Sequence, residues 1–231
     1  MHFGVQIAVT CVALFSGGAL RACDTAVCLV DPDTLHFTRV ITFDDLPSSP
    51  GIGRQIDTVL VQPGARFGER FLGQTLFNTG DFDLVQGPAL PPLTAIAGAP
   101  GQSLGSIRLA STTVLHGHGP RGFPNPEAVG EGAISVVFDR DQTAFGFDIR
   151  GGESGAATVV FLRRDGSIIA SLGLGPLAEK SYAFVRRMGE NDIAGFLFEN
   201  TDPQGVSLDN LRFENNQVIG QPLQRLTRHR G

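Results

Sequence analysis

The chain has no tryptophan, one tyrosine, three cysteines and no long run of like charges. Tryptophan and tyrosine normally provide the flat amphipathic faces on which proteins stack sugar rings. An aromatic sugar platform is therefore not expected, and any glycan recognition has to use polar loop groups. The net charge of −5, with one short basic tail, argues against nucleic-acid binding.

Signatures of catalysis are also missing from the sequence. No Gly-x-Ser-x-Gly elbow occurs, and the stretch nearest to a phosphate-binding loop, residues 171–176, lacks the lysine. Four carboxylates qualify for glycoside hydrolysis by residue type alone: Glu127, Glu131, Asp148 and Glu153. We therefore assign no catalytic residue and expect a protein that is not an enzyme.

The residues that are abundant indicate an all-β fold. Seventeen phenylalanines, thirty glycines and fourteen prolines suit many short strands and turns. In the central stretch 132–172, Phe145, Phe147 and Ile149 alternate with Gly146 and Asp148, which predicts a strand with one buried face. Polar turns at 139–142 and 163–166 predict hairpins, so this stretch is expected to form an antiparallel meander.

The rest of the domain follows the same pattern. Further strands are predicted at 37–43, 56–61, 65–71, 106–109, 182–186, 193–198 and 206–213, with mostly irregular segments at 74–102 and 115–132. Short strands at regular intervals are typical of a single antiparallel β-sandwich of jelly-roll type, which we place at residues 37–215.

The two ends of the chain are expected to lie outside this domain. Residues 1–22 are predicted to be an export signal, because residues 5–20 are apolar and small residues precede a cleavage position after Ala19; the alternative is a buried N-terminal strand or helix. The protein is thus expected to be secreted, extracellular or periplasmic, with no transmembrane span in the mature chain. Residues 216–231 are predicted to be a flexible basic tail.

Two readings apply to the cysteines in the linker, residues 23–36. Because Cys11 would leave with the signal, Cys23 and Cys28 are expected to form a disulfide, as suits an oxidising compartment. Alternatively, Leu20 to Cys23 resembles a bacterial lipobox, in which Cys23 would carry a lipid anchor; Arg21 departs from that pattern.

Three short motifs point to a family: ITFDDLP at 41–47, GAISVVFDRDQTAFGFDIRGG at 132–152 and GVSLDNLRFEN at 205–215. Together they resemble the secreted bacterial β-sandwich proteins that often carry a PEP-CTERM sorting tail. The resemblance covers roughly residues 37–215 and implies a non-catalytic extracellular module of lectin-like or carbohydrate-binding shape. The motifs of the sorting tail do not follow Asn215, so sorting by that route is not expected.

A calcium site is the main candidate for chemistry. Asp44 and Asp45 follow the first strand of the domain, and Asp209 and Asn210 lie in the last. Chain ends commonly meet in jelly rolls, and Ca²⁺ prefers such oxygen ligands. The alternative is that these residues cap local turns.

Two histidines are not expected to bind a metal ion. His116 and His118 are close in sequence, but two ligands in a glycine-rich loop do not complete a zinc site, so they are predicted to be exposed loop residues.

The leading functional hypothesis is binding of an extracellular glycan or cell-envelope polymer, supported by structural calcium, with the ligand-binding residues unassigned. The alternatives are a structural or matrix protein that has no specific ligand and, least favoured, a hydrolase on the same scaffold.

Overall fold

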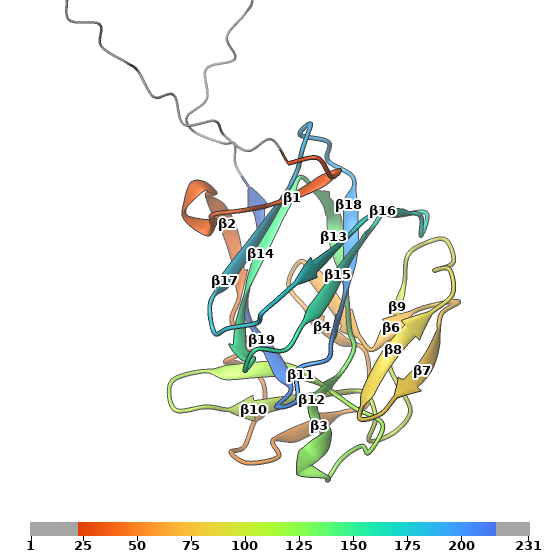
Figure 1. The fold of residues 1–231 in the computed structure, drawn as a ribbon, viewed down its shortest axis with the longest axis vertical. Coiled ribbons are helices and arrows are strands. Elements are labelled where there is room, and N and C mark those ends of the chain that lie inside the picture. The colour runs from red at the N-terminus through yellow and green to blue at the C-terminus, as the bar shows by residue number, and fades with distance from the viewer. Residues whose placement is uncertain (1–22, 216–231) are drawn as a thin grey trace, which may run out of the picture.

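A computed structural model describes residues 23–215, so the predicted export signal and basic tail lie outside the described residues. The chain forms an all-β fold in which two large antiparallel sheets pack face to face (Figure 1). This confirms the predicted antiparallel β-sandwich; its jelly-roll type stays a prediction. Within residues 23–215, no helix has the length and hydrophobicity needed to span a membrane.

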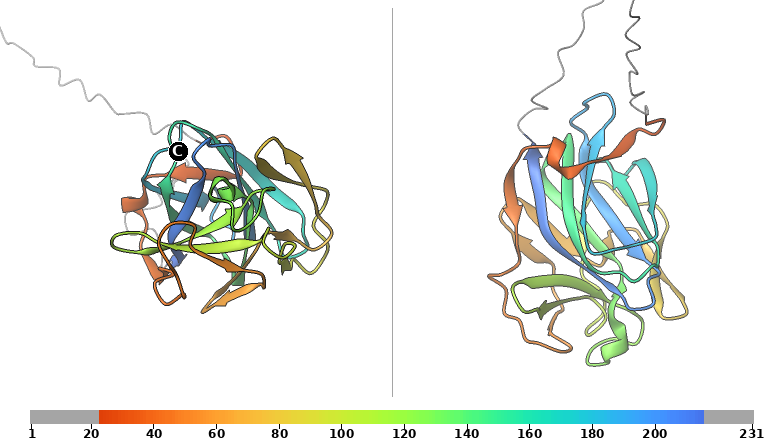
Figure 2. Two further views of the ribbon diagram at one scale, coloured as in Figure 1. Left: turned by 90° about the horizontal axis from the view of Figure 1, so that it is seen from below. Right: turned by 60° about the vertical axis from the view of Figure 1, so that its left-hand side comes forward.

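The first sheet has nine strands, and Figure 2 shows it from two further sides. Its central order is β1 (Val27–Val30), β17 (Ser181–Arg186), β14 (Ala144–Gly151), β19 (Val206–Asn215), β11 (Thr113–His118), β10 (Leu104–Arg108) and β3 (Arg54–Ile56). In addition, β2 (Phe37–Ile41) pairs with β19 and β12 (Val129–Gly132) pairs with β11.

The second sheet has six strands, in the order β16 (Ile168–Leu174), β15 (Ala157–Leu162), β18 (Ile193–Asn200), β13 (Ile134–Gln142), β5 (Ala65–Gly68) and β4 (Leu60–Gln62). Two small sheets flank it: β6 (Arg70–Phe71) with β9 (Ala95–Ile96), and the hairpin β7 (Thr75–Thr79) with β8 (Phe82–Gln86). Two 3₁₀ turns, η1 (Pro32–Thr34) and η2 (Pro126–Ala128), complete the described elements.

Phenylalanine fills the space between the two large sheets. Phe145, Phe147 and Ile149 of β14 are fully buried, as their alternation predicted. The Phe145 ring stacks on Phe196 with centroids 4.5 Å apart, and Phe138 packs against Phe145 at 5.5 Å. Aromatic pairs at such separations add to the stabilisation that burial alone provides.

The predicted meander is only partly correct. Strands β15 and β16 do form a hairpin around the turn at 163–166. In contrast, β13 pairs with β18 and β5, whereas β14 pairs with β17 and β19, so the two strands lie in different sheets. Residues 139–142, predicted to be a turn, are the last residues of β13, and only Thr143 separates this strand from β14. The reason is that Phe138 and Phe145 face the same core from opposite sides, which a hairpin within one sheet would not allow.

Two predicted strands are each interrupted by an acidic residue. The segment 56–61 divides around Asp57, whose Oδ1 accepts a hydrogen bond from Gly101 N at 2.8 Å, and its halves join different sheets. The segment 65–71 divides at Glu69 into β5 and β6. Conversely, the segments expected to be mostly irregular contain β7, β8, β9, β11 and β12.

Candidate functional site

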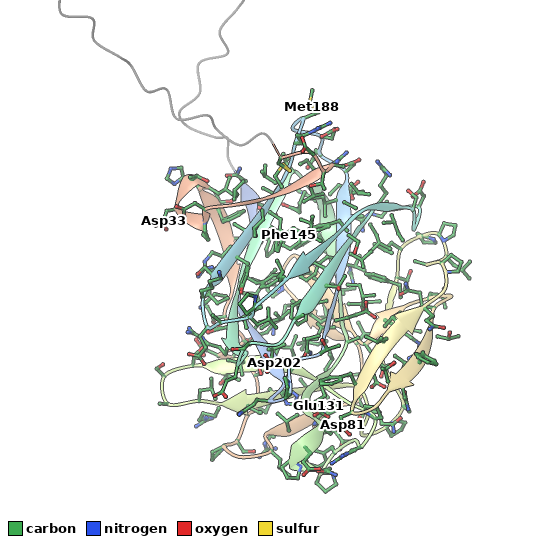
Figure 3. The ribbon with its side chains drawn as sticks, viewed as in Figure 1. Asp33, Asp81, Glu131, Phe145, Met188 and Asp202 are labelled. Atoms are coloured by element: carbon green, nitrogen blue, oxygen red, sulfur yellow. A yellow bond between two sulfur atoms is a disulfide. The ribbon has the colours of Figure 1, made fainter. Side chains whose placement is uncertain are left out.

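A polar pocket of about 470 Å³ lies at the end of the sandwich that carries the β7–β8 turn and β12. Figure 3 shows Asp81 and Glu131 close together at this end, below Asp202. Four segments meet here: the β7–β8 turn, the loop that follows β11, strand β12 and the turn before β19. The lining residues are Asp81, Arg121, Pro126, Glu127, Val129, Glu131, Pro203 and Gln204.

Three other hollows of similar volume, 460–480 Å³, lie elsewhere along the described part of the chain. None of them is lined by a buried carboxylate that lacks a hydrogen-bond partner, whereas the end pocket contains Glu131. Native proteins rarely leave such a group without a partner, so this pocket is the candidate site.

Local sequence fixes the walls of the pocket. Asn125 caps η2 by accepting a hydrogen bond from Glu127 N at 2.9 Å, and Pro126 starts that turn with its preset φ. Across from it, buried Asp202 accepts from Gln204 N at 3.1 Å and from Gly155 N at 2.8 Å, which holds the turn before β19.

Gly119 is required for the approach of Glu131. A Cβ atom at this position would lie 2.7 Å from the Glu131 Cβ and 2.6 Å from the Asp81 carbonyl oxygen. Only glycine therefore lets the loop after β11 pass between the hairpin turn and β12.

Arg121 connects two walls of the pocket. Its Nη2 donates to Asp81 Oδ1 at 2.8 Å, and its Nη1 forms an ion pair with Glu127. All three side chains are well exposed, so these ion pairs contribute little to folding stability. Their main effect is to orient two carboxylates and one guanidinium around the same opening.

Glu131 forms the buried inner wall. Its side chain is 7% exposed, and its Oε2 is buried with no hydrogen-bond partner among the described residues. Burial and then the Asp81 carboxylate raise the pKa of Glu131 to about 7, although Arg121 acts in the opposite direction.

More carboxyl groups lie behind Glu131. Asp83 is 2% exposed with its Oδ2 unpartnered, and burial, followed by the charge of Glu69, raises its pKa to about 7. Glu69 is also buried with one oxygen unpartnered, and its other oxygen pairs with Arg70. This end of the molecule thus holds an excess of buried carboxyl groups over basic groups.

The two histidines are not exposed loop residues, so that prediction was wrong. His116 and His118 lie in β11 at 0% and 1% exposure, with ring centroids 4.6 Å apart. Glycine at position 105, opposite His116 on β10, leaves room for both rings. Among residues 23–215, no three His, Cys, Asp or Glu side chains are arranged to hold a metal ion.

The structure brings two of the four predicted calcium ligands together. Asp44 Oδ1 accepts from Thr113 N at 2.8 Å and from the Thr112 hydroxyl at 3.2 Å, and that hydroxyl is 3.3 Å from Asp209 Oδ2. The same Asp209 oxygen accepts from Arg150 Nε and Nη2 at 3.3 and 3.2 Å. A guanidinium thus already offsets the Asp209 charge.

The other two predicted ligands face different partners. Asp45 accepts from Gln62 Nε2 at 3.2 Å. Asn210 Nδ2 donates to Asp148 Oδ2 at 2.8 Å. Cys23 and Cys28 are joined by a disulfide, and Cys28 lies within the edge strand β1.

Of the four carboxylates singled out for hydrolysis, Glu127 and Glu131 line the pocket. Glu153 stands at its rim, where its Oε2 accepts from Gln204 Nε2 at 2.8 Å. Asp148 lies elsewhere, fully occupied by Arg212 and other donors. Sequence reasoning missed Asp81, although the Asn-Thr-Gly-Asp turn between Leu76, Phe77, Phe82 and Leu84 is a recognisable hairpin signal.

No family model matches the sequence, and none of the curated proteins compared with it is significantly similar. The function therefore has to be argued from the pocket.

Proposed function

We propose that the protein is a secreted, non-catalytic β-sandwich module that binds a glycan or another cell-envelope polymer in the end pocket. The observation that carries this proposal is an open pocket of about 470 Å³ whose walls combine carboxylates, a guanidinium, an amide and two prolines. Sugar hydroxyls both donate and accept hydrogen bonds. Glu127 can accept from them, Gln204 can donate to them, and the prolines offer small apolar faces.

The construction of the pocket supports a binding role. The Arg121 ion pairs and the Asp202 hydrogen bonds hold the lining groups in place before any ligand arrives, which lowers the entropic cost of binding. The resemblance to secreted β-sandwich proteins of the PEP-CTERM type is consistent with an extracellular polymer as the partner. Support of binding by calcium stays a prediction.

The proposal is tested by screening the mature chain on a glycan array and on isolated envelope polymers, with and without a chelator. Gln204→Ala removes an amide that lines the pocket without changing its charge, and we expect it to weaken binding about tenfold, or 1.4 kcal/mol. Gln55→Ala is the matched control, because Gln55 is also an exposed amide that donates to a carboxylate, Asp57, outside the pocket.

The alternatives predict different outcomes. A structural or matrix protein would associate with itself and bind no member of the array. A hydrolase would release reducing ends from a glycan that it binds. Either result would contradict the proposed function.

A further inference from the structure

The charge of the end pocket restricts its ligand. Its lining contains three carboxylates, from Asp81, Glu127 and Glu131, and one guanidinium, from Arg121, so its formal charge is −2 when all four are ionised. Glu153 adds a further carboxylate at the rim. A neutral sugar would leave this negative charge uncompensated, and an acidic sugar would be repelled.

Glu131 provides an acceptor that no group of the protein uses. Three charged side chains influence it: Asp81 from the hairpin turn, Asp83 from β8 and Arg121 from the loop after β11. Arg121 donates to Asp81 and Glu127 instead. The buried Oε2 of Glu131 therefore lies beside other carboxylates and has no donor of its own.

We infer that the pocket takes a glycan with free amino groups, a deacetylated amino sugar, whose ammonium binds to Glu131 beside Asp81. This inference rests on the proposed function. An ammonium carries a positive charge and three donors and has no acceptor, which matches a carboxylate that lines a negative pocket and whose buried oxygen has no donor. N-acetylation would remove that charge and two of the donors.

The remaining lining groups favour a sugar over a basic peptide. A lysine side chain would supply the ammonium but no hydroxyl groups for Gln204 and Arg121 on the opposite walls. An amino sugar presents an ammonium and several hydroxyls on one rigid ring, so both kinds of contact form at a lower entropic cost.

Binding is expected to displace a proton. Because its pKa is raised to about 7, Glu131 is mostly protonated near pH 6. The ammonium of the ligand stabilises the ionised form of Glu131 over the protonated form. The proton of Glu131 is therefore released to the buffer, while the ammonium keeps its own protons. A neutral ligand would cause no such release.

The test is calorimetric titration near pH 6 with a fully deacetylated glucosamine tetramer and with its N-acetylated counterpart, each in two buffers of different ionisation enthalpy. We expect the deacetylated tetramer to bind at least about tenfold more tightly and its heat to differ between the buffers. Glu131→Gln should abolish both effects. Asp139→Asn, which alters an exposed carboxylate paired with Arg66 outside the pocket, should abolish neither.

The possible outcomes separate this inference from the proposed function. Equal affinity for the two tetramers, or an amine preference that survives Glu131→Gln, would overturn the inference and leave glycan binding intact. Equally tight binding of a tetralysine peptide would overturn the assignment to a sugar. Binding to no glycan at all would reject the proposed function, and the inference with it.

Discussion

The centre of the sandwich and the end that carries the pocket are built in opposite ways. Around Phe147, the core contains rings from both sheets: Phe184 at 5.5 Å, Phe196 at 5.7 Å and Phe198 at 5.7 Å. At the end that carries the pocket, several buried side chains are polar and lack hydrogen-bond partners. Of the seven buried side-chain atoms without a hydrogen-bond partner among the described residues, six belong to one group that we call the polar set: Glu69, Asp83, His116, His118 and Glu131.

Within one domain, different regions therefore serve stability and function. Apolar burial is the main stabilising contribution to folding, and it is concentrated where the phenylalanines are. Buried polar atoms without partners cost stability, and such costs typically persist where function requires them. The pocket beside Glu131 is where the polar set reaches the surface.

The largest expected effect comes from the phenylalanine core. Phe147→Ala removes a fully buried ring that packs against aromatic rings of β17 and β18. We expect it to lower the free energy of unfolding by about 3–5 kcal/mol, measured by chemical denaturation. Phe77→Ala is the control, because Phe77 is 51% exposed on β7 and its loss should change stability by less than about 0.5 kcal/mol. Similar losses in both variants would mean that the core is not organised around β14.

The next effect is a change of stability with pH at the polar end. The pKa of Asp83 is raised to about 7 in the folded state, whereas an unfolded chain keeps the ordinary value near 4. Between these values only the unfolded state ionises Asp83, so its contribution to stability is present below about pH 4 and is lost as pH rises toward 7. Asp83→Asn stays neutral and avoids this loss.

The measurement is the difference in unfolding free energy between Asp83→Asn and the unmutated protein at pH 4 and pH 8. We expect this difference to move in favour of the variant by up to about 4 kcal/mol, since the pKa is about three units higher in the folded state and each unit corresponds to about 1.4 kcal/mol. A difference that is the same at both pH values would show that Asp83 ionises normally in the folded protein.

The unmutated protein alone would not show this effect clearly. Burial lowers the pKa of His116 to about 3, so only the unfolded state protonates it between about pH 6.5 and pH 3. Its contribution to stability is therefore lost as pH falls, which is opposite in sign to that of Asp83. Comparison with the variant removes this contribution, because His116 is present in both proteins.

The same contrast explains what could be predicted from the sequence. The alternation of Phe145, Phe147 and Ile149 is a local pattern that depends only on burial of one strand face, so the fold class and this core were recognisable. Which sheet each strand joins depends on partners far along the chain, and the pairing of β13 and β14 was therefore predicted wrongly.

The residues of the pocket form no local sequence pattern from which it could be predicted. Asp81, Arg121, Glu131 and Gln204 come from four separate segments, and their convergence depends on how the hairpin and loops fold against β12. Every residue of β11 is buried, and His116 and His118 share one of its faces, so an alternation of apolar and polar residues gave no signal for them.

The smallest expected effect concerns calcium at the predicted site. A site occupied at a hundredfold excess over its dissociation constant would stabilise the fold by about 2.7 kcal/mol. At Asp209, however, Ca²⁺ would have to compete with the Arg150 guanidinium, and Asp44 already accepts two hydrogen bonds. We therefore expect added Ca²⁺ to raise the unfolding free energy by less than about 1 kcal/mol, with a chelator reversing the change.

Arg150→Gln sharpens this last prediction. The substitution leaves Asp209 without its cation, 3.3 Å from a hydroxyl that it shares with Asp44, so two carboxylates face each other with no charge to offset them. The variant should be less stable without calcium and should gain more from it than the unmutated protein, whereas Asp209→Ala should not respond. If thermal melting of Arg150→Gln ignores both calcium and chelator, Asp44 and Asp209 do not form a calcium site. If the unmutated protein is stabilised by calcium and Glu131→Gln abolishes that stabilisation, the ion binds at the polar end instead.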